Sequence, residues 1–278
     1  MNILFQRYLR LLGFEHPPTG LEGLRQLVRA HIVRVPFENV SKLLLFDREG
    51  RGRLNTIDEF LNGIEQQDLG GTCYTSNPFF SELLNELGYR AELRSADMNT
   101  PNVHSSSRVF LDGREYHVDV GNAAPFLEPV PLDRLPYEFA RGEMKWVFDR
   151  AEDNRLRCDV LQNGERIYSY TVNHAAQSHE FFQEIIIDSF QRGRTFMSLL
   201  RLVRIFPEHT VELMNRSLKV HRGQATTETT INSMDELRHV VDTLFLMPRC
   251  PVEKAVEILE RINEMKFFGA TQERSLYA

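Results

Sequence analysis

Apolar residues recur at helical spacing through the first 88 residues, so this part of the chain is predicted to be largely helical. Thr56 and Glu59 match a capping box, which marks the start of one of these helices. Pro78 lies early in the last helical run, so the first turn there is either kinked or starts later. The predicted helices cover residues 3–12, 20–31, 57–67 and the run that follows Cys73 and ends at Gly88.

From Tyr89 the apolar period changes to two, which predicts β-strands. The clearest signal is a hairpin of residues 103–111 and 114–121, because the Asp-Gly pair between them is typical of two-residue turns. In that register Leu111 pairs with Arg114 and His104 lies opposite Gly121. The face of the hairpin that does not carry His104 is expected to pack into the core. Its residues are Val109, Leu111, Tyr116, Val118 and Val120.

The remaining pattern is mixed. A buried strand is expected at residues 184–187 and a helix at 190–204, whereas residues beyond 269 are expected to fray unless they dock. Further strands are predicted at 144–148, 156–161 and 166–172, and as a pair formed by 211–220 with 225–231. Two further helices are predicted, from the capping box at Ser233 to about residue 245, and from 252 to about 265.

Composition narrows the class of protein. The 278 residues are 42% hydrophobic and 26% charged, which is ordinary for a globular protein. The net charge of −6 argues against a nucleic-acid or anionic-membrane binder, and no apolar run is long enough for a membrane span. The first 14 residues contain two arginines and lack the pattern of a signal peptide. Three widely spaced cysteines suggest a reducing compartment and hence a cytoplasmic protein, and no metal site is expected.

Cys73 is the first candidate for chemistry. It follows a glycine pair and stands where a helix begins, and the positive end of a helix dipole favours a thiolate over a thiol. The alternative is a small buried cysteine with no chemical role. Whether Cys73 is reactive or structural therefore depends on which other side chains are predicted to lie near it.

His104 and Asp119 supply such side chains. In the predicted hairpin they are diagonal neighbours on one face, roughly 7–8 Å apart at the backbone, which brings a carboxylate within reach of an imidazole. An aspartate placed in this way orients the histidine and stabilises its protonated form, which in turn holds a nearby cysteine as thiolate. Gly121 is expected to leave space beside the ring. His117 shares this face, but it lies beside Arg108 and is interpreted as structural.

Several short motifs occur in an order that resembles the arylamine N-acetyltransferases, including the N-hydroxyarylamine O-acetyltransferases. The motifs are residues 19–24 with His31, 35–39, 70–73 with Asn77, His104, 119–121 and 129–132. The resemblance implies an α+β fold of papain-like architecture. Residues 1–88 would form a helical domain with the nucleophile, 89–190 a central antiparallel β-barrel domain with the histidine and aspartate, and 191–278 an α/β lid domain.

The resemblance also implies an activity. Cys73 would take an acetyl group from acetyl coenzyme A as a thioester and pass it to an arylamine, hydrazine or N-hydroxyarylamine in a ping-pong reaction. His104 and Asp119 would complete a catalytic triad with Cys73, without a metal. The implied substrate-binding residues are Phe37, Gly71, Thr72, Gly121 and Asn122, with an ordinary core aromatic as the alternative for Phe37. The sequence leaves open whether the chain forms a homodimer.

Three departures from the family pattern leave other functions open. Leu69 replaces the usual arginine, so Glu38 lacks its cation unless Arg34 or another base substitutes; Thr75 replaces a glutamate or glutamine. Asn122-Ala123 stand where the family commonly has phenylalanine and glycine. The alternatives are an amide synthase-like acyltransferase with a carrier-bound or longer acyl donor, a papain-like hydrolase, and a catalytically silent binding protein.

Overall fold

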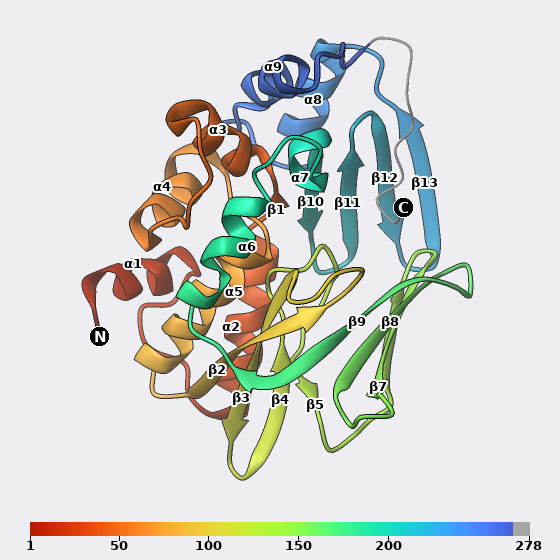
Figure 1. The fold of residues 1–278 in the computed structure, drawn as a ribbon. Helices are drawn as coiled ribbons and strands as arrows, with labels where there is room; N and C mark the ends of the chain where they lie inside the picture. The colour runs from red at the N-terminus through yellow and green to blue at the C-terminus, as the bar shows by residue number, and fades with distance from the viewer. Residues whose placement is uncertain (269–278) are drawn as a thin grey trace.

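The N-terminal third of the protein is helical. The structure is a computed structural model that describes residues 1–268, and Figure 1 shows its first helices gathered on one side. They are α1 (Ile3–Leu11), α2 (Gly20–Arg34), α3 (Val40–Glu49), α4 (Ile57–Gln67) and α5 (Cys73–Glu86). The predicted capping box forms, because the Thr56 side chain accepts from the Glu59 amide and the Glu59 carboxylate accepts from the Thr56 amide.

Helix α3 was not predicted. Its apolar residues Val40 and Leu43 are buried, and Gly50 ends it in the left-handed conformation with φ of 68°. The break at residues 35–39 does form, as the short strand β1 (Phe37–Glu38). The predictions for α1, α2 and α4 are confirmed, with α2 running three residues past His31 to Arg34.

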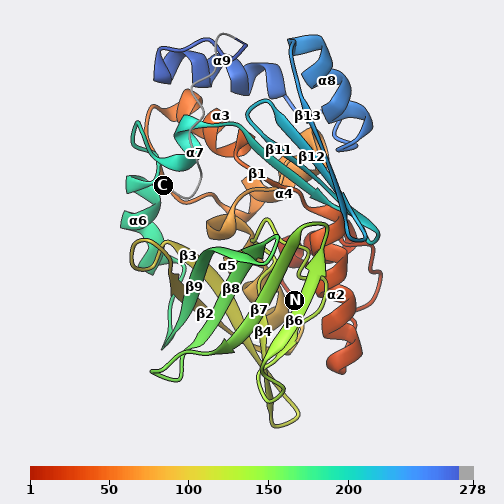
Figure 2. The same cartoon turned by 90° about the vertical axis from the view of Figure 1, so that its right-hand side faces the viewer.

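An antiparallel sheet of eight strands follows and curves into an incompletely closed barrel (Figure 2). Its strand order is β5-β4-β3-β2-β9-β8-β7-β6, so β5 and β6 are the unpaired edges. The strands are β2 (Arg90–Asp97), β3 (His104–Leu111), β4 (Arg114–Val118), β5 (Val130–Pro131), β6 (Tyr137–Arg141), β7 (Met144–Arg150), β8 (Leu156–Gln162) and β9 (Glu165–Ala176). The predicted hairpin register is confirmed from Leu111 paired with Arg114 to Ser107 paired with Val118.

A second antiparallel sheet lies above the barrel in Figure 1, with the order β1-β10-β11-β12-β13. Its strands are β1, β10 (Arg201–Ile205), β11 (His209–Met214), β12 (Ser217–Arg222) and β13 (Ala225–Thr230). Strand β1 comes from the N-terminal region and pairs with β10, so a segment more than 150 residues away in the chain forms the edge of this sheet. The end of the segment predicted at 211–220 does pair with residues from 225 onward, as β12 with β13.

Three predictions for the C-terminal half are wrong. Residues 184–187 form the helix α6 (Gln183–Asp188) after the short 3₁₀ turn η1 (Glu180–Phe182), because only Ile186 is buried and Ile187 is 45% exposed. The helix predicted at 190–204 reduces to α7 (Thr195–Ser198), since β1 recruits residues 201–205 into the sheet as β10. The strand predicted at 211–220 reverses at Asn215, whose φ is 53°, and so becomes β11 and β12.

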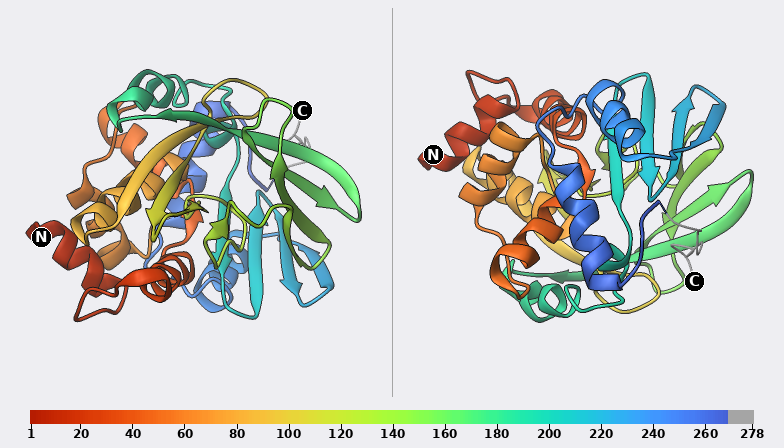
Figure 3. Two further views of the ribbon diagram at one scale, coloured as in Figure 1. Left: turned by 90° about the horizontal axis from the view of Figure 1, so that it is seen from below. Right: turned by 90° about the horizontal axis from the view of Figure 1, so that it is seen from above.

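Two apolar cores hold these elements together. One lies between α1, α2, α4, α5 and the barrel, and the other between α3, the five-stranded sheet and two C-terminal helices, α8 (Met234–Thr243) and α9 (Val252–Asn263). Figure 3 shows α9 beside α3, and these two helices pack directly. The three-part division of the chain therefore stays a prediction, because residues from the first 88 contribute to both cores. The fraying expected beyond residue 269 lies outside the described residues.

None of the helices within residues 1–268 is long and apolar enough to cross a membrane.

A buried histidine joins three of the N-terminal helices. The Tyr8 hydroxyl on α1 lies 2.6 Å from His31 Nδ1 on α2, and the His31 ring packs edge-on against Phe80 of α5. Both His31 and Tyr8 are fully buried. Burial lowers the pKa of His31 to about 3, so the folded protein holds this imidazole neutral.

We expect His31 to make the protein less stable as the pH falls. An unfolded chain protonates its histidines below about pH 6.5, whereas folded His31 resists protonation, so unfolding gains a proton there. The free-energy advantage of the wild type over His31→Gln should therefore shrink by about 2 kcal/mol between pH 7 and pH 5 in urea unfolding. Tyr8→Phe is the control, because it keeps His31 and should keep the pH dependence. A constant difference between wild type and His31→Gln would contradict the prediction.

Candidate active site

Cys73 is the first residue of α5 and is 7% exposed. The helix begins at Cys73 and includes Pro78. Of the two predicted alternatives, a later start of the helix is therefore wrong. Proline lacks the amide that would bond the carbonyl four residues earlier. That carbonyl belongs to Tyr74, and it lies 3.2 Å from His179 Nε2, which satisfies it instead. The helix that carries Cys73 is thus completed by a residue from beyond the barrel.

The glycine pair before Cys73 allows a close approach to residues 36–38. A Cβ at Gly70 would lie 2.0 Å from the Pro36 carbonyl oxygen, so a larger residue does not fit. Gly71 forms a parallel bridge with Phe37, and its carbonyl accepts from the Glu38 amide at 3.2 Å. The start of α5 is therefore tied to β1 through its backbone.

His104 and Asp119 form the hydrogen bond expected from the sequence. The distance from His104 Nε2 to Asp119 Oδ2 is 2.7 Å, and both side chains are buried. Burial by itself lowers the pKa of His104, but the charges of Asp119 and Cys73, and their hydrogen bonds to the ring, outweigh it and raise the pKa to about 10. Asp119 thus bonds to His104, and the Cys73 side chain lies close enough to the imidazole to contribute to its raised pKa.

The route by which Asp119 reaches this position differs from the prediction. Strand β4 ends at Val118, so His104 is not paired with Gly121; on its other side it pairs with Ala96 of β2. Residues 119–121 instead leave the ladder and turn toward α5. A Cβ at Gly121 would lie 2.6 Å from Cys73 Cα, so this glycine provides room for the helix rather than for the imidazole ring.

Asn77 holds this turn in place. Its Oδ1 accepts from the amides of Val120 at 2.9 Å and Gly121 at 3.2 Å, and its Nδ2 donates to Asp119 Oδ1 at 2.9 Å and to the Ser105 carbonyl at 2.6 Å. Asn77 is 1% exposed and lies one helical turn after Cys73. Asn77 is not among the site residues predicted from the sequence. The available signal was a polar residue four positions after the cysteine on a helix face that is otherwise buried.

His117 supports the site from the side. Its Nε2 lies 3.5 Å from the Tyr170 hydroxyl, which is itself 3.5 Å from Asp119 Oδ2. Burial lowers the pKa of His117 to about 4, so its ring is neutral. The contacts and the low pKa of His117 agree with the prediction that it is structural and does not take the place of His104.

The other residues proposed for substrate binding lie around the triad. Phe37 is half-buried, with its ring centroid 5.8 Å from that of Phe196, and Thr72 is buried at the start of α5. Asn122 donates from Nδ2 to Asp119 Oδ2 at 3.2 Å. Gly71 and Gly121 are placed by backbone packing as described above. None of these contacts tests whether a substrate binds there, so these roles remain predictions.

The departure at Leu69 has a structural answer. Leu69 is buried in the second core, and no cation within residues 1–268 forms an ion pair with Glu38. Instead the Glu38 carboxylate accepts from the amides of Ser41 at 2.8 Å and Gly70 at 3.1 Å. Burial raises the pKa of Glu38 although these bonds oppose it. Backbone amides therefore bond to Glu38 in place of the missing cation, and neither Arg34 nor another described base forms an ion pair with it.

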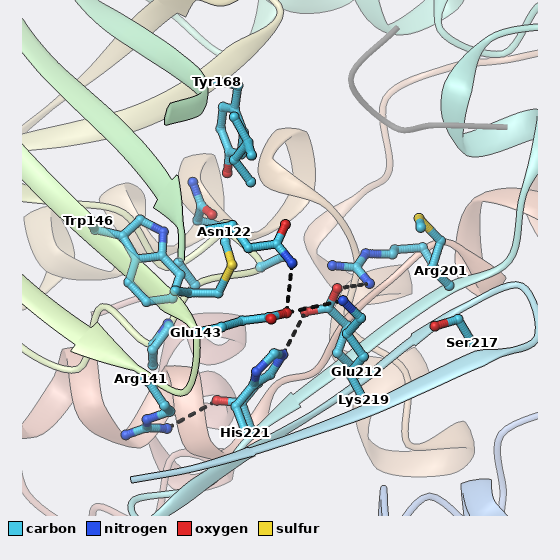
Figure 4. Close-up of a pocket in the computed structure, with 18 residues that line it drawn as sticks. Asn122, Arg141, Glu143, Trp146, Tyr168, Arg201, Glu212, Ser217, Lys219 and His221 are labelled. Atoms are coloured by element: carbon cyan, nitrogen blue, oxygen red, sulfur yellow. Dashed lines mark hydrogen bonds and ion pairs between the residues drawn. The ribbon is translucent and has the colours of Figure 1, made fainter. Parts of the chain in front are cut away.

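A cavity of about 250 Å³ lies between the barrel and the five-stranded sheet (Figure 4). Cys73 and His104 do not line it, but Asn122 does, and Asn122 bonds to Asp119. The cavity is therefore adjacent to the triad and separated from it by one residue. No cluster of three or more histidine, cysteine or acidic side chains suited to a metal occurs in the part of the chain that the structure describes.

Comparison with known proteins identifies the family. The model of a family described as N-acetyltransferase matches residues 20–248. This chain belongs to that N-acetyltransferase family. Its sequence is 26% identical to an arylamine N-acetyltransferase of Mycolicibacterium smegmatis, over 86% of this chain and 90% of the relative. It is also 34% identical to a proansamycin X synthase of Amycolatopsis mediterranei, over 87% of this chain and 96% of the relative.

Solved structures agree on the fold of this N-acetyltransferase family member. The arylamine N-acetyltransferase of Mycobacterium abscessus superposes with a TM-score of 0.79 at 20% identity, over 94% of this chain and 95% of that one. The enzyme of Mycobacterium marinum in complex with CoA superposes with a TM-score of 0.76 at 20% identity, over 94% and 99%. The family resemblance and the α+β, papain-like fold class are confirmed.

We expect Asn77 to be essential for the geometry of the site. Asn77→Ala leaves the buried Val120 amide without its partner, removes one of two acceptors of the Gly121 amide and deletes two donated bonds, and should lower the free energy of unfolding by about 3 kcal/mol. Asn122→Ala is the matched control, because it removes one partly exposed bond to the same carboxylate and should cost at most about 1 kcal/mol. Urea unfolding measures both. Equal effects of the two substitutions would show that Asn77 does not hold the turn.

Proposed function

We propose that this protein is an acyltransferase that moves an acetyl group from acetyl coenzyme A, through a Cys73 thioester, to an arylamine, hydrazine or N-hydroxyarylamine. The observation that carries the proposal is the buried group of Cys73, His104 and Asp119, with 2.7 Å from imidazole to carboxylate and a pKa of His104 that both neighbours raise. Membership of the N-acetyltransferase family and the CoA complex of the Mycobacterium marinum relative support acetyl coenzyme A as donor.

In the first half-reaction the Cys73 sulfur attacks the thioester carbonyl of the donor. The carbon–sulfur bond to coenzyme A breaks, and the departing thiolate takes a proton from the His104 imidazolium. The raised pKa of His104 keeps that proton on the ring at neutral pH until the leaving group needs it. Asp119 orients the ring and stabilises its charge without taking the proton.

In the second half-reaction the amine attacks the acetyl-Cys73 carbonyl. His104, now neutral, accepts a proton from the attacking nitrogen, and the carbon–sulfur bond to Cys73 breaks to release the amide. Because one acyl-enzyme links two separate half-reactions, the kinetics are ping-pong. The thioester on Cys73 is close in energy to the donor thioester, so transfer onward is easy.

A second candidate is an amide synthase-like acyltransferase with a longer or carrier-bound acyl donor. The 34% identity to a proansamycin X synthase favours it, as do Asn122-Ala123 at the border of the cavity. Both candidates use the same acyl-cysteine and differ only in donor and acceptor. Cys73, Cys158 and Cys250 are all free, which supports the proposal of a reducing, cytoplasmic setting. Whether two copies associate remains open to measurement.

Incubation with acetyl coenzyme A should add one acetyl mass to the wild-type protein, and Cys73→Ala should abolish the label. Cys158→Ala and Cys250→Ala are matched controls that should keep it, because both thiols are buried and burial raises the pKa of each, which disfavours a nucleophilic thiolate. Intact-protein mass spectrometry provides the measurement. A wild type that remains unlabelled rules out acetyl coenzyme A as the donor. A label that water removes as fast as an amine does indicates a hydrolase.

Asp119→Asn should slow acetylation of Cys73 by roughly 10³–10⁴-fold, because the amide no longer stabilises the protonated imidazole. Asp97→Asn is the control, since Asp97 lies in the same barrel and its carboxylate pairs with Arg155 at 2.9 Å rather than with His104. Rapid-quench mass detection of the acyl-enzyme gives both rates. A near-normal rate for Asp119→Asn removes the carboxylate from the mechanism.

A further inference from the structure

The cavity beside the triad is lined by both sheets. On the barrel side, Met144 and Trp146 of β7 and Ile167 and Tyr168 of β9 supply apolar and aromatic surface, and Arg141, Glu143 and Gln162 supply polar groups. The second wall comes from β10, β11 and β12 and carries Arg201, Glu212, Lys219 and His221. Figure 4 shows Arg141 and Glu143 on the same side as Trp146, with Arg201, Glu212 and Lys219 across from them.

The charges of the second wall are held in pairs. Arg201 Nη1 lies 2.8 Å from Glu212 Oε1, and His221 Nε2 lies 3.6 Å from Glu212 Oε2. Lys219 Nζ lies 3.1 Å from Glu143 Oε1. Burial alone would raise the pKa of Glu212, but Arg201 and His221 lower it to about 2, so the carboxylate stays charged. The wall therefore presents polar atoms without a large uncompensated charge.

Arg141, another cation that lines the cavity, already has hydrogen-bond partners within the protein. The Arg141 guanidinium donates to the carbonyls of Phe206 and Pro207 and to the Thr210 hydroxyl at 2.9–3.1 Å. These bonds tie β6 to the β10–β11 turn and fix the two sheets relative to each other around the cavity. A charged ligand would have to break a buried ion pair to find a partner here, which is costly.

The wall composition selects a chemical class. A bare aromatic or alkyl group would cover the paired charges without replacing their hydrogen bonds to water, which is unfavourable. A neutral ligand with several oxygens can bond to Lys219, Glu212 and His221 while its carbon skeleton lies on Trp146. The volume of about 250 Å³ exceeds the roughly 150 Å³ that accommodates benzene, so more than one ring or a short chain fits.

We propose that this cavity binds a neutral substrate portion with several hydroxyl or carbonyl oxygens on an apolar skeleton, and that Lys219 and its neighbours make this protein prefer it over a plain aryl or alkyl group. The inference rests on the proposed acyl transfer at Cys73. The position supports it, because Asn122 lines the cavity and bonds to the Asp119 carboxylate. The substrate portion is either the acyl chain of the donor or the body of the acceptor.

The first arm of the test measures binding without chemistry. Trp146 is the only tryptophan of the chain and lines the cavity, so its fluorescence reports on occupancy there. Cys73→Ala is titrated with the N-acetylcysteamine thioesters of 3,5-dihydroxyhexanoate and of hexanoate. We expect a saturable signal with at least about tenfold tighter binding of the dihydroxy thioester, because the site is built to hydrogen-bond oxygen atoms.

The second arm uses the active protein. Acetyl transfer from acetyl coenzyme A is compared for 4-(2-hydroxyethoxy)aniline and 4-butylaniline, which are of similar size. If the cavity holds the acceptor, kcat/KM should be at least about tenfold higher for the oxygenated aniline. A preference in the first arm alone assigns the cavity to the acyl chain, and a preference in the second alone assigns it to the acceptor. Either result supports the proposal.

Lys219→Met should reduce the preference to within about threefold, because a main hydrogen-bond donor of the wall is lost. Lys145→Met is the matched control; Lys145 lies on β7 beside Trp146 but pairs with Glu138 outside the cavity, so the preference should persist. The proposal is overturned if neither arm shows a preference, or if Lys219→Met and Lys145→Met act alike. Because the first arm needs no acyl-enzyme, loss of Cys73 acetylation in the wild type would count against the proposed function separately.

Discussion

The site depends on one buried set of hydrogen bonds between helix α5 and the segment that leaves strand β4. Asn77 gives both of its side-chain groups to this contact, and through it the carboxylate of Asp119 is fixed one helical turn from Cys73. Because these groups are buried, loss of Asn77 would leave polar atoms such as the Val120 amide without a partner, and the geometry is strongly defined. The same helix thus provides the sulfur and the clamp that positions its distant partners.

The contact between Asn77 and the segment after β4 explains why glycines occur beside helix α5. The clamp requires the β4 exit to lie against the helix backbone, and Gly121 is the residue that permits that approach. Gly70 does the same on the other side, where the chain touches Pro36 and carries β1 into the five-stranded sheet. The nucleophile therefore lies where the helices, the barrel and the second sheet all meet.

The proposed chemistry and the proposed selectivity use separate sets of residues. Cys73, His104 and Asp119 are enclosed by buried partners, whereas the adjacent cavity is formed by side chains from the two sheets. Asn122 is the residue common to both. A protein built in this way can keep one acyl-transfer mechanism while the wall of its cavity adapts to different substrates, because the two sets of residues share little.

By itself the sequence determined the features that depend on neighbours along the chain. The capping box at Thr56 and the hairpin register through Val118 follow from local turn and cap chemistry. The hydrogen bond between His104 and Asp119 was predicted from an extension of that register, but it forms through residues that leave the ladder after Val118. Only the tertiary structure determines the path of the backbone after β4. Asn77 bonds to residues 119–121, which would otherwise continue the pairing of β4 with β3. The tertiary structure also turned residues 201–205 into a strand, since β1 offers them an edge, and it assembled the charged cavity wall from β10, β11 and β12. These outcomes depend on contacts between segments far apart in the chain, and no local pattern of apolar and polar residues encodes such contacts.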